Sequence, residues 1–180
     1  MTTSSFSTSL PATGLPERFK PYASRSLPRY TSYPTALAFE AVEDDADSRA
    51  WLAQTGAGDA LSVYVHTPFC DRLCWYCGCH TSVPNGYERV ARFVETLKAE
   101  IELWAGAVGS HGSMAHLHFG GGSPNALSPD DFGGLVTLLV ERFGLRPGAE
   151  VAVELDPANL TAAFAARMGE VGVTRASLGV

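Results

Sequence analysis

Hydrophobic and polar residues alternate with two different periods along residues 61–180. A period of two predicts β-strands over Leu61–His66, Met114–Phe119, Glu150–Leu155 and Arg175–Val180. A period near 3.6 predicts helices over residues 86–107, 128–143 and 161–171. The second of these helices also carries a start signal, because Ser128-Pro129-Asp130-Asp131 places a capping side chain, a proline and two acids in its first turn.

The N-terminal part of the chain has a different pattern. Residues 1 to about 35 are rich in Ser, Thr and Pro and show no periodicity, which predicts an extended arm. Residues Ala36–Ala53 are rich in Ala and acidic side chains, which predicts one helix with a solvated segment at Glu43–Asp45. We therefore divide the chain into an arm and helix, residues 1–57, and a domain, residues 58–180.

Strands that alternate with helices predict right-handed βαβ units and an α/β fold with a parallel sheet. A complete (β/α) barrel takes about 250 residues, and the segment from residue 61 onward is long enough for roughly half of one. The last predicted strand has no helix after it, although parallel strands are normally covered. We expect the N-terminal part of a larger, partial barrel with about four parallel strands; a small open α/β domain is the alternative.

Composition and charge narrow the class of protein. The 180 residues include 13 Lys and Arg against 19 Asp and Glu, a net charge of −6, which argues against a nucleic-acid-binding protein. No apolar run is long enough to span a membrane, and the N-terminus lacks the pattern of a secretory signal. We expect a soluble, cytoplasmic protein that has neither nucleic-acid nor membrane partners.

The four cysteines are confined to one short segment, Cys70-x3-Cys74-x2-Cys77-x-Cys79. A secreted disulfide framework spreads its cysteines along the chain, so this spacing indicates metal or redox chemistry instead. Thiolates this close can bind an iron–sulfur cluster, and three of them would leave one iron open for another ligand. A zinc site completed by His66 or His80 and a redox pair at Cys74 and Cys77 are the alternatives.

Two further motifs follow the next two predicted strands. Gly120-Gly121-Gly122-Ser123-Pro124 follows the second strand, and Glu154-Leu155-Asp156-Pro157 closes the third. Sites in barrels and open α/β sheets form at the carboxyl ends of strands, so these motifs and the cysteine loop should share one rim. The glycines allow a ligand to approach backbone N–H groups, or else they accommodate tight packing.

The alternation of side chains places further polar residues on one face of the strands. Tyr64 and His66 share a face of the first strand, as His116 and His118 do on the second. A buried imidazole with its hydrogen bonds satisfied is the favoured interpretation for His116 and His118, and an equal alternative for His66. Glu154 is either part of the next helix start or a carboxylate aimed at a ligand.

The segment Tyr64-x-His66-x-Pro68-Phe69-Cys70-x3-Cys74-x-Tyr76-Cys77 resembles the cluster motif of radical S-adenosylmethionine (radical SAM) enzymes. Within that superfamily, other motifs resemble the family of oxygen-independent coproporphyrinogen III oxidases, or coproporphyrinogen dehydrogenases. They are Cys77-Gly78-Cys79, the arm Arg29-Tyr30-Thr31-Ser32-Tyr33-Pro34-Thr35-Ala36, the glycine triplet, Val153-Glu154-Leu155-Asp156-Pro157 and Arg175-x-Ser177-x-Gly179-Val180. The haem-chaperone branch of the superfamily generally lacks the arm and the Cys-Gly-Cys ending, so it fits this sequence less well than the oxidases do. A haem chaperone or a non-catalytic haem-binding module is therefore the second choice.

The resemblance implies an oxidoreductase of haem (porphyrin) biosynthesis that carries a [4Fe–4S] cluster and two molecules of S-adenosylmethionine. A 5′-deoxyadenosyl radical made at the cluster would start the oxidative decarboxylation of two propionates of coproporphyrinogen III to vinyl groups, giving protoporphyrinogen IX. An electron donor such as flavodoxin or ferredoxin and a monomeric full-length protein are also implied. Family members continue well beyond this sequence, so we expect the chain to be an inactive fragment that lacks later strands and a C-terminal domain.

The resemblance also assigns site residues position by position. It implies that Cys70, Cys74 and Cys77 hold the cluster and that Cys79, whose role is open, does not. It implies that Tyr64, Gly121 and Glu154 contact one S-adenosylmethionine, that Tyr76, Gly122 and Ser123 contact the second, and that Arg29 and Tyr30 meet the substrate carboxylates. Tyr64, His66 and Cys79 are the catalytic candidates. The sequence departs mildly from the family pattern at Thr67, Trp75 and Ser123.

Overall fold

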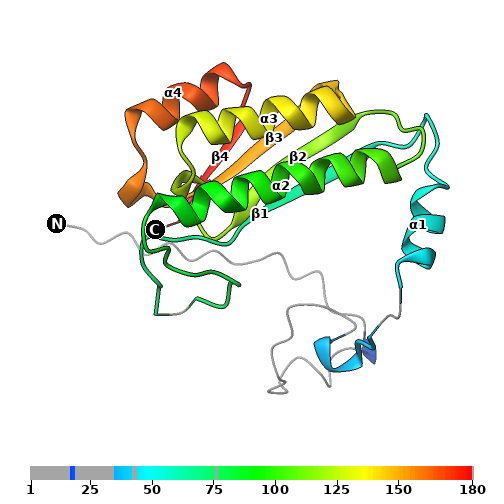
Figure 1. Cartoon of the computed structure of the whole chain (residues 1–180), viewed down its shortest axis with the longest axis horizontal. Helices are drawn as coiled ribbons and strands as arrows, with labels where there is room; N and C mark the ends of the chain where they lie inside the picture. The colour runs from blue at the N-terminus through cyan, green and yellow to red at the C-terminus, as the bar shows by residue number, and fades with distance from the viewer. Residues whose placement is uncertain (1–16, 19–34, 42–43, 76, 180) are drawn as a thin grey trace. The chain divides into compact units, whose positions relative to one another are not determined.

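The computed structural model describes residues 17–18, 35–41, 44–75 and 77–179. The chain forms two compact units, Met1–Glu43 and Asp44–Val180. The first unit contains a 3₁₀ turn, η2 (Ala36–Ala38), and the second contains the sheet and the α-helices (Figure 1). Most of the predicted arm lies outside the described residues, and the predicted domain boundary near residue 57 stays a prediction.

The prediction of one helix over residues 36–53 is wrong. Helix α1 covers only Ala46–Leu52, and residues 39–41 after η2 are not helical. The Asp44 Oδ1 atom accepts a hydrogen bond from the Ala46 N–H at 2.9 Å, just before the helix begins. Short acidic side chains that bond to nearby backbone favour a helix start over a helix interior. The alanine-rich composition therefore overstated the length of the helix.

Four parallel strands form one sheet, as predicted. They are β1 (Leu61–Thr67), β2 (Met114–Gly121), β3 (Leu145–Leu155) and β4 (Arg175–Leu178), in the order β1-β2-β3-β4. Strand β3 begins earlier than the predicted Glu150, because its first part pairs irregularly with β2: Met114 pairs with Leu145, and His116 already pairs with Glu150. Gly148 takes a φ of +77° inside this bulge, a conformation that suits glycine.

The helices between the strands pack on one face of the sheet (Figure 1). They are α2 (Tyr87–Ala107), α3 (Pro129–Phe143) and α4 (Ala162–Glu170), with short 3₁₀ turns η3 (Pro124–Ala126) and η4 (Pro157–Asn159) after β2 and β3. A doubly wound sheet reverses its strand order and carries helices on both faces. Sequential strands with all crossovers on one face are the arrangement of a (β/α) barrel segment, which confirms the predicted fold class.

Helices α2 and α3 are joined at both ends by polar contacts. The Tyr87 hydroxyl donates to Asp131 and accepts from the Ser128 N–H at 2.7 Å, which ties the two N-termini together. Burial, with a further contribution from Asp131, raises the pKa of Tyr87. Farther along, the Arg142 guanidinium donates two hydrogen bonds to Glu102 Oε1 and one to Oε2 and so lowers the pKa of Glu102. The pair α2–α3 thus packs as one layer.

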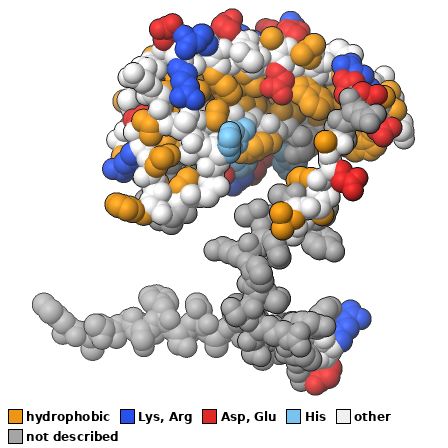
Figure 2. Space-filling model, turned by 60° about the horizontal axis from the view of Figure 1, so that its bottom comes forward, with side chains coloured by type: hydrophobic (Ala, Val, Ile, Leu, Met, Phe, Trp, Pro, Cys, Tyr) orange, Lys and Arg blue, Asp and Glu red, His pale blue; other side chains and the backbone are white. Residues whose placement is uncertain are grey.

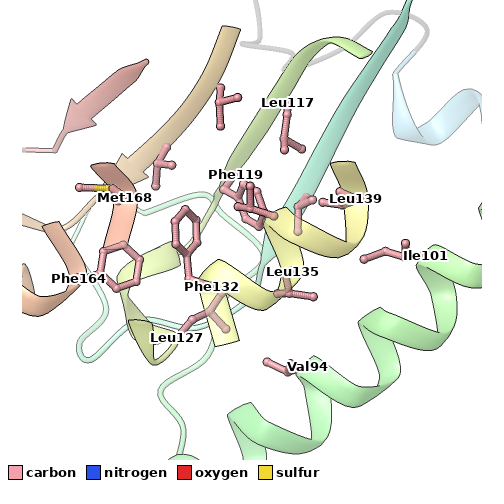
Figure 3. Close-up of a cluster of buried hydrophobic side chains, with 14 of the residues drawn as sticks. Val94, Ile101, Leu117, Phe119, Leu127, Phe132, Leu135, Leu139, Phe164 and Met168 are labelled. Atoms are coloured by element: carbon pink, nitrogen blue, oxygen red, sulfur yellow. The ribbon is translucent and has the colours of Figure 1, made fainter. Parts of the chain in front are cut away.

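The hydrophobic core lies between the sheet and this helical layer (Figure 3). The Phe132 ring packs between Phe119, at a centroid distance of 5.1 Å, and Phe164, at 4.9 Å. All three rings are almost completely buried, and burial of aromatic side chains is a major source of folding free energy. Because the apolar residues of the strands face the helices, the opposite face of the sheet is free to carry polar side chains.

Thr67 is a polar exception within this core. Its side chain is 0% exposed, and among the described residues its Oγ1 atom has no hydrogen-bond partner. We expect Thr67→Val to raise the free energy of unfolding by about 1 kcal/mol, because it removes a buried hydroxyl that gains no compensating bond. Urea denaturation of the cluster-free chain, followed by far-ultraviolet circular dichroism, measures the change.

Thr174→Val is the matched control for this prediction. The Thr174 hydroxyl accepts from the Val151 N–H at 2.9 Å and donates to the Val151 carbonyl at 3.2 Å. The same substitution should here lower the free energy of unfolding by about 1 kcal/mol. Equal losses at both positions would show that the unpaired Thr67 hydroxyl carries no penalty.

Candidate functional site

The predicted site residues that the structure describes lie on β1, β2 and β3 and on the loops that follow these strands. Tyr64 and Glu154 alternate with buried strand residues and so lie on the sheet face away from the helices. Tyr64 is 58% exposed there and Glu154 is exposed, although both are strand residues. Figure 2 shows histidine side chains at the surface of this unit, next to hydrophobic and acidic ones. Ligand-binding sites of parallel sheets form at this edge, where the strands have their carboxyl ends.

The cysteine loop leaves β1 and is closed at its base. Phe69 and Ser82 form a parallel β-bridge. The Cys70 N–H donates to the Ser82 carbonyl at 3.2 Å, and the Ser82 N–H donates to the Pro68 carbonyl at 3.0 Å. Backbone pairing thus anchors both ends of the loop to the sheet, so that all four cysteines stay at the rim.

Hydrogen-bond donors surround two of the sulfur atoms. Cys70 Sγ accepts from the Thr81 hydroxyl at 3.3 Å and the Ser123 hydroxyl at 3.8 Å, and Cys77 Sγ accepts from the Cys79 N–H at 3.4 Å. Such bonds stabilise thiolate charge and tune cluster sulfurs. All four cysteines are free, and Cys74, Cys77 and Cys79 are exposed.

The donor set fits an iron–sulfur cluster by its chemistry, because soft thiolates are the ligands that such clusters take. Within the described ranges no group of three or more His, Cys, Asp or Glu side chains is close enough to hold a metal ion. Both ring nitrogens of His66 are already engaged, Nδ1 with the Tyr64 hydroxyl at 3.2 Å and Nε2 with the His80 carbonyl at 2.9 Å. His66 is therefore not available to complete a zinc shell.

The glycine triplet locks the cysteine loop onto β2. The Gly122 N–H donates to the Thr67 carbonyl at 2.8 Å, and the Ser123 N–H donates to the Phe69 carbonyl at 2.7 Å. A Cβ atom on Gly122 would lie 2.4 Å from the Phe69 carbonyl oxygen, and Gly121 has a φ of +103° against the His66 ring. These two N–H groups serve the loop rather than a ligand, so the tight-packing alternative describes this part of the turn.

A row of polar side chains crosses the three strands beside the loop. The Tyr64 and His118 rings lie 5.7 Å apart, and His118 Nε2 lies 3.2 Å from Glu154 Oε1. Burial raises the pKa of Tyr64, and the charges of Glu154 and Cys79 add to the effect. The row joins one residue from each of β1, β2 and β3, and Tyr64 and His118 form the strand pair two residues before His66 and Gly120.

The structure corrects the expectations for several of these side chains. The prediction that His116 and His118 are buried is wrong, because His116 is exposed and His118 is half-buried against Glu154. Glu154 does not cap the next helical turn; Asp156 does, accepting from the Ala158 N–H at 2.9 Å. Glu154 is thus the carboxylate that faces open space.

The remaining predicted residues fall into two groups. Cys79 is exposed beside Cys77; partial burial raises its pKa, and the Cys77 sulfur, the Cys70 sulfur and Glu154 add to the effect. Ser123 is buried with its hydroxyl toward Cys70. The predicted substrate residues Arg29 and Tyr30, and the predicted cofactor residue Tyr76, lie outside the described residues.

Sequence reasoning missed some of the residues that build this rim. Thr81 donates to Cys70, and Gly120 leaves room for the Glu154 carboxylate. Asn125 exchanges hydrogen bonds with the Asp156 backbone at 2.9 and 3.1 Å, which ties the β2 and β3 loops together. Only Gly120 belonged to a visible motif; single Thr and Asn residues carry no signal of their own.

Comparisons with known proteins agree with this geometry. The Radical SAM superfamily matches residues 64–180. The oxygen-independent coproporphyrinogen III oxidase of Bradyrhizobium diazoefficiens is 45% identical over 159 residues, which cover 88% of this chain and 35% of that protein. The Escherichia coli protein of the same name is 36% identical over 159 residues, which cover 85% of this chain and 33% of that one.

A solved structure shows the same fold. Coproporphyrinogen III oxidase from Escherichia coli, described as a radical SAM enzyme, superimposes with a TM-score of 0.72 at 32% identity over 84% of this chain and 34% of that one. The chain therefore spans about a third of the length of the relatives that it matches. None of the helices that the structure describes combines the length and the apolar character needed to cross a membrane. By its matched residues, its parallel sheet and its cysteine loop, the chain belongs to the radical SAM superfamily.

Proposed function

We propose that this chain carries the cluster loop and the S-adenosylmethionine site of an oxygen-independent coproporphyrinogen III oxidase. The observation that carries the proposal is the cysteine loop, anchored at both ends beside the exposed Glu154 carboxylate. Thiolates that suit an iron–sulfur cluster and an exposed carboxylate that could accept from a ligand's amino group then share one rim. Similarity to proteins with this activity supports the choice of reaction.

In this proposal Cys70, Cys74 and Cys77 hold a [4Fe–4S] cluster. A bound cluster would supply the electron for the reductive cleavage of S-adenosylmethionine, which is the source of the radical chemistry proposed for the propionates of coproporphyrinogen III. The hydroxyls of Thr81 and Ser123 stabilise the Cys70 sulfur. Because Cys70 lies at the anchored end of the loop, its sulfur would already be in place when the cluster binds.

The chain's own residues then orient the cofactor. Glu154 would accept a hydrogen bond from the amino group of one S-adenosylmethionine, and Tyr64 and Gly121 would contact the same molecule. We extend the proposal to a second S-adenosylmethionine at Tyr76, Gly122 and Ser123, which would meet the last two through atoms other than their N–H groups, since these donate to the cysteine loop. Arg29 and Tyr30 are the residues proposed to meet the substrate carboxylates. A flavodoxin or ferredoxin would supply electrons.

Anaerobic reconstitution of the chain with iron and sulfide tests this proposal. We expect about four irons per chain and a brown chromophore. S-Adenosylmethionine should change the electron paramagnetic resonance spectrum of the reduced cluster, because it binds at the open iron. A cluster whose spectrum does not respond to S-adenosylmethionine would contradict the proposed function, and a colourless chain that binds zinc instead would replace it with a structural zinc site.

A further inference from the structure

We propose that His118 is a positioning residue that holds the Glu154 carboxylate ready for the amino group of S-adenosylmethionine. The inference rests on the proposed function, because it concerns the same site. None of the motifs in the sequence pointed to His118 as a functional residue.

The strand register brings the two side chains together. Tyr64 on β1 pairs with His118 on β2, and Glu154 lies on the adjacent strand β3, one step beyond the last β2–β3 pair, Phe119 and Val153. His118 Nε2 reaches Glu154 Oε1 at 3.2 Å, and the Tyr64 ring packs on the other side of the imidazole at 5.7 Å. The histidine is therefore held between a ring and a carboxylate.

The contact with His118 engages one oxygen of the Glu154 carboxylate, Oε1. An imidazole that carries its proton on Nε2 donates one hydrogen bond to Oε1, and Oε2 keeps its acceptor capacity. Arg or Lys would bring a permanent charge that competes with a ligand donor, whereas neutral histidine does not. Within the part of the chain that the structure describes, Glu154 pairs with His118, and no Lys or Arg side chain forms an ion pair with Glu154.

Exposure and space at the carboxylate fit the same role. The Glu154 side chain is 48% exposed and that of His118 is 29% exposed, so the ligand side is open while the histidine is partly covered. A Cβ atom on Gly120 would lie 2.8 Å from Glu154 Oε2 and 3.1 Å from the Tyr64 ring. Because Gly120 has no side chain, the Glu154 carboxylate can occupy the space above it.

Without His118 the Glu154 side chain would sample several rotamers, and binding would have to order it. We therefore expect His118→Phe to weaken S-adenosylmethionine binding to the cluster-loaded chain about tenfold, the equivalent of one hydrogen bond to a charged group. His118→Gln should restore affinity to within about threefold, because the Gln amide can donate in place of Nε2. Equilibrium dialysis under anaerobic conditions measures both.

A second ligand separates positioning from general damage. 5′-Methylthioadenosine lacks the α-amino and carboxylate groups of the methionine moiety, so its affinity should stay within about twofold in His118→Phe. His116→Phe is the matched control, since His116 is exposed on the same strand face, and it should leave both affinities unchanged. Gly120→Ala, which crowds Oε2, should reproduce the selective loss seen in His118→Phe.

The outcomes are distinguishable. If the unaltered chain binds S-adenosylmethionine and His118→Phe binds it equally well, or if both ligands weaken together, the role of His118 is overturned and the proposed function stands. If the unaltered chain does not bind S-adenosylmethionine, the proposed function fails first. Imidazole ¹⁵N spectra of the cluster-free chain provide a further readout: the Nε2 signal of His118 should carry the shift of a nitrogen hydrogen-bonded to a carboxylate, and Glu154→Ala, which removes the acceptor, should abolish that shift.

Discussion

Serine in place of Cys70, Cys74 or Cys77 is expected to abolish cluster binding, with iron falling from about four per chain to near zero. The alcohol oxygen is a hard and weakly acidic donor, so it does not replace a thiolate on iron. Of the three variants, Cys70→Ser should lose iron most completely, because the Cys70 sulfur accepts from two hydroxyl groups at the anchored base of the loop. Iron analysis and visible absorption after anaerobic reconstitution give the result.

Cys79→Ser is the matched control in the same loop. Cys79 is exposed, and its backbone N–H donates to the Cys77 sulfur at 3.4 Å, a contact that Ser at position 79 keeps. We expect this variant to retain about four irons. If Cys79→Ser lost its iron while Cys70→Ser kept it, the assignment of the three ligands would be wrong, and Cys74, Cys77 and Cys79 would become the ligand set.

The strands and the large helices could be predicted because their apolar stripes match the packing that they meet. The stripe Phe132, Leu135, Val136, Leu139 and Phe143 of α3 is buried as expected. The start of β3 could not be predicted, because the alternating pattern indicates a strand only from Glu150, whereas the chain joins the sheet from Leu145 through a bulge that contains Gly148. Helix α1 was overestimated because composition alone does not reveal which acidic residue begins the helix.

The candidate site was predictable where its residues are close in sequence. The cysteine spacing placed the loop, and period-two alternation placed Tyr64 and His66 on one face. The pair of His118 and Glu154 was not predictable, because it depends on the register between β2 and β3. Likewise, the glycine triplet indicated that another group lies close to the backbone, but not whether that group belongs to a ligand or to the protein. The close neighbour of Gly122 is the protein's own backbone, at Phe69.

This close approach leads to the second strong expectation, for Gly122→Ala. The added Cβ would lie 2.4 Å from the Phe69 carbonyl oxygen and 2.7 Å from the Thr81 hydroxyl. The Phe69 carbonyl cannot move freely, because it accepts from the Ser123 N–H at 2.7 Å and its residue pairs with Ser82. We expect a loss of about 1–3 kcal/mol in the free energy of unfolding and a several-fold loss of iron loading. Urea denaturation and iron analysis measure the two effects.

Gly134→Ala separates this clash from the general effect of replacing glycine. Nothing lies within 4 Å of a Cβ at Gly134, which is inside α3. Alanine in a helix interior is favoured over glycine by roughly 0.5–1 kcal/mol, so this variant should be more stable than the original chain and bind iron normally. Opposite signs at the two glycines would tie the triplet to the docking of the cysteine loop. A stabilised Gly122→Ala chain with full iron content would mean that the loop docks by other contacts, and that the triplet is open to a ligand after all.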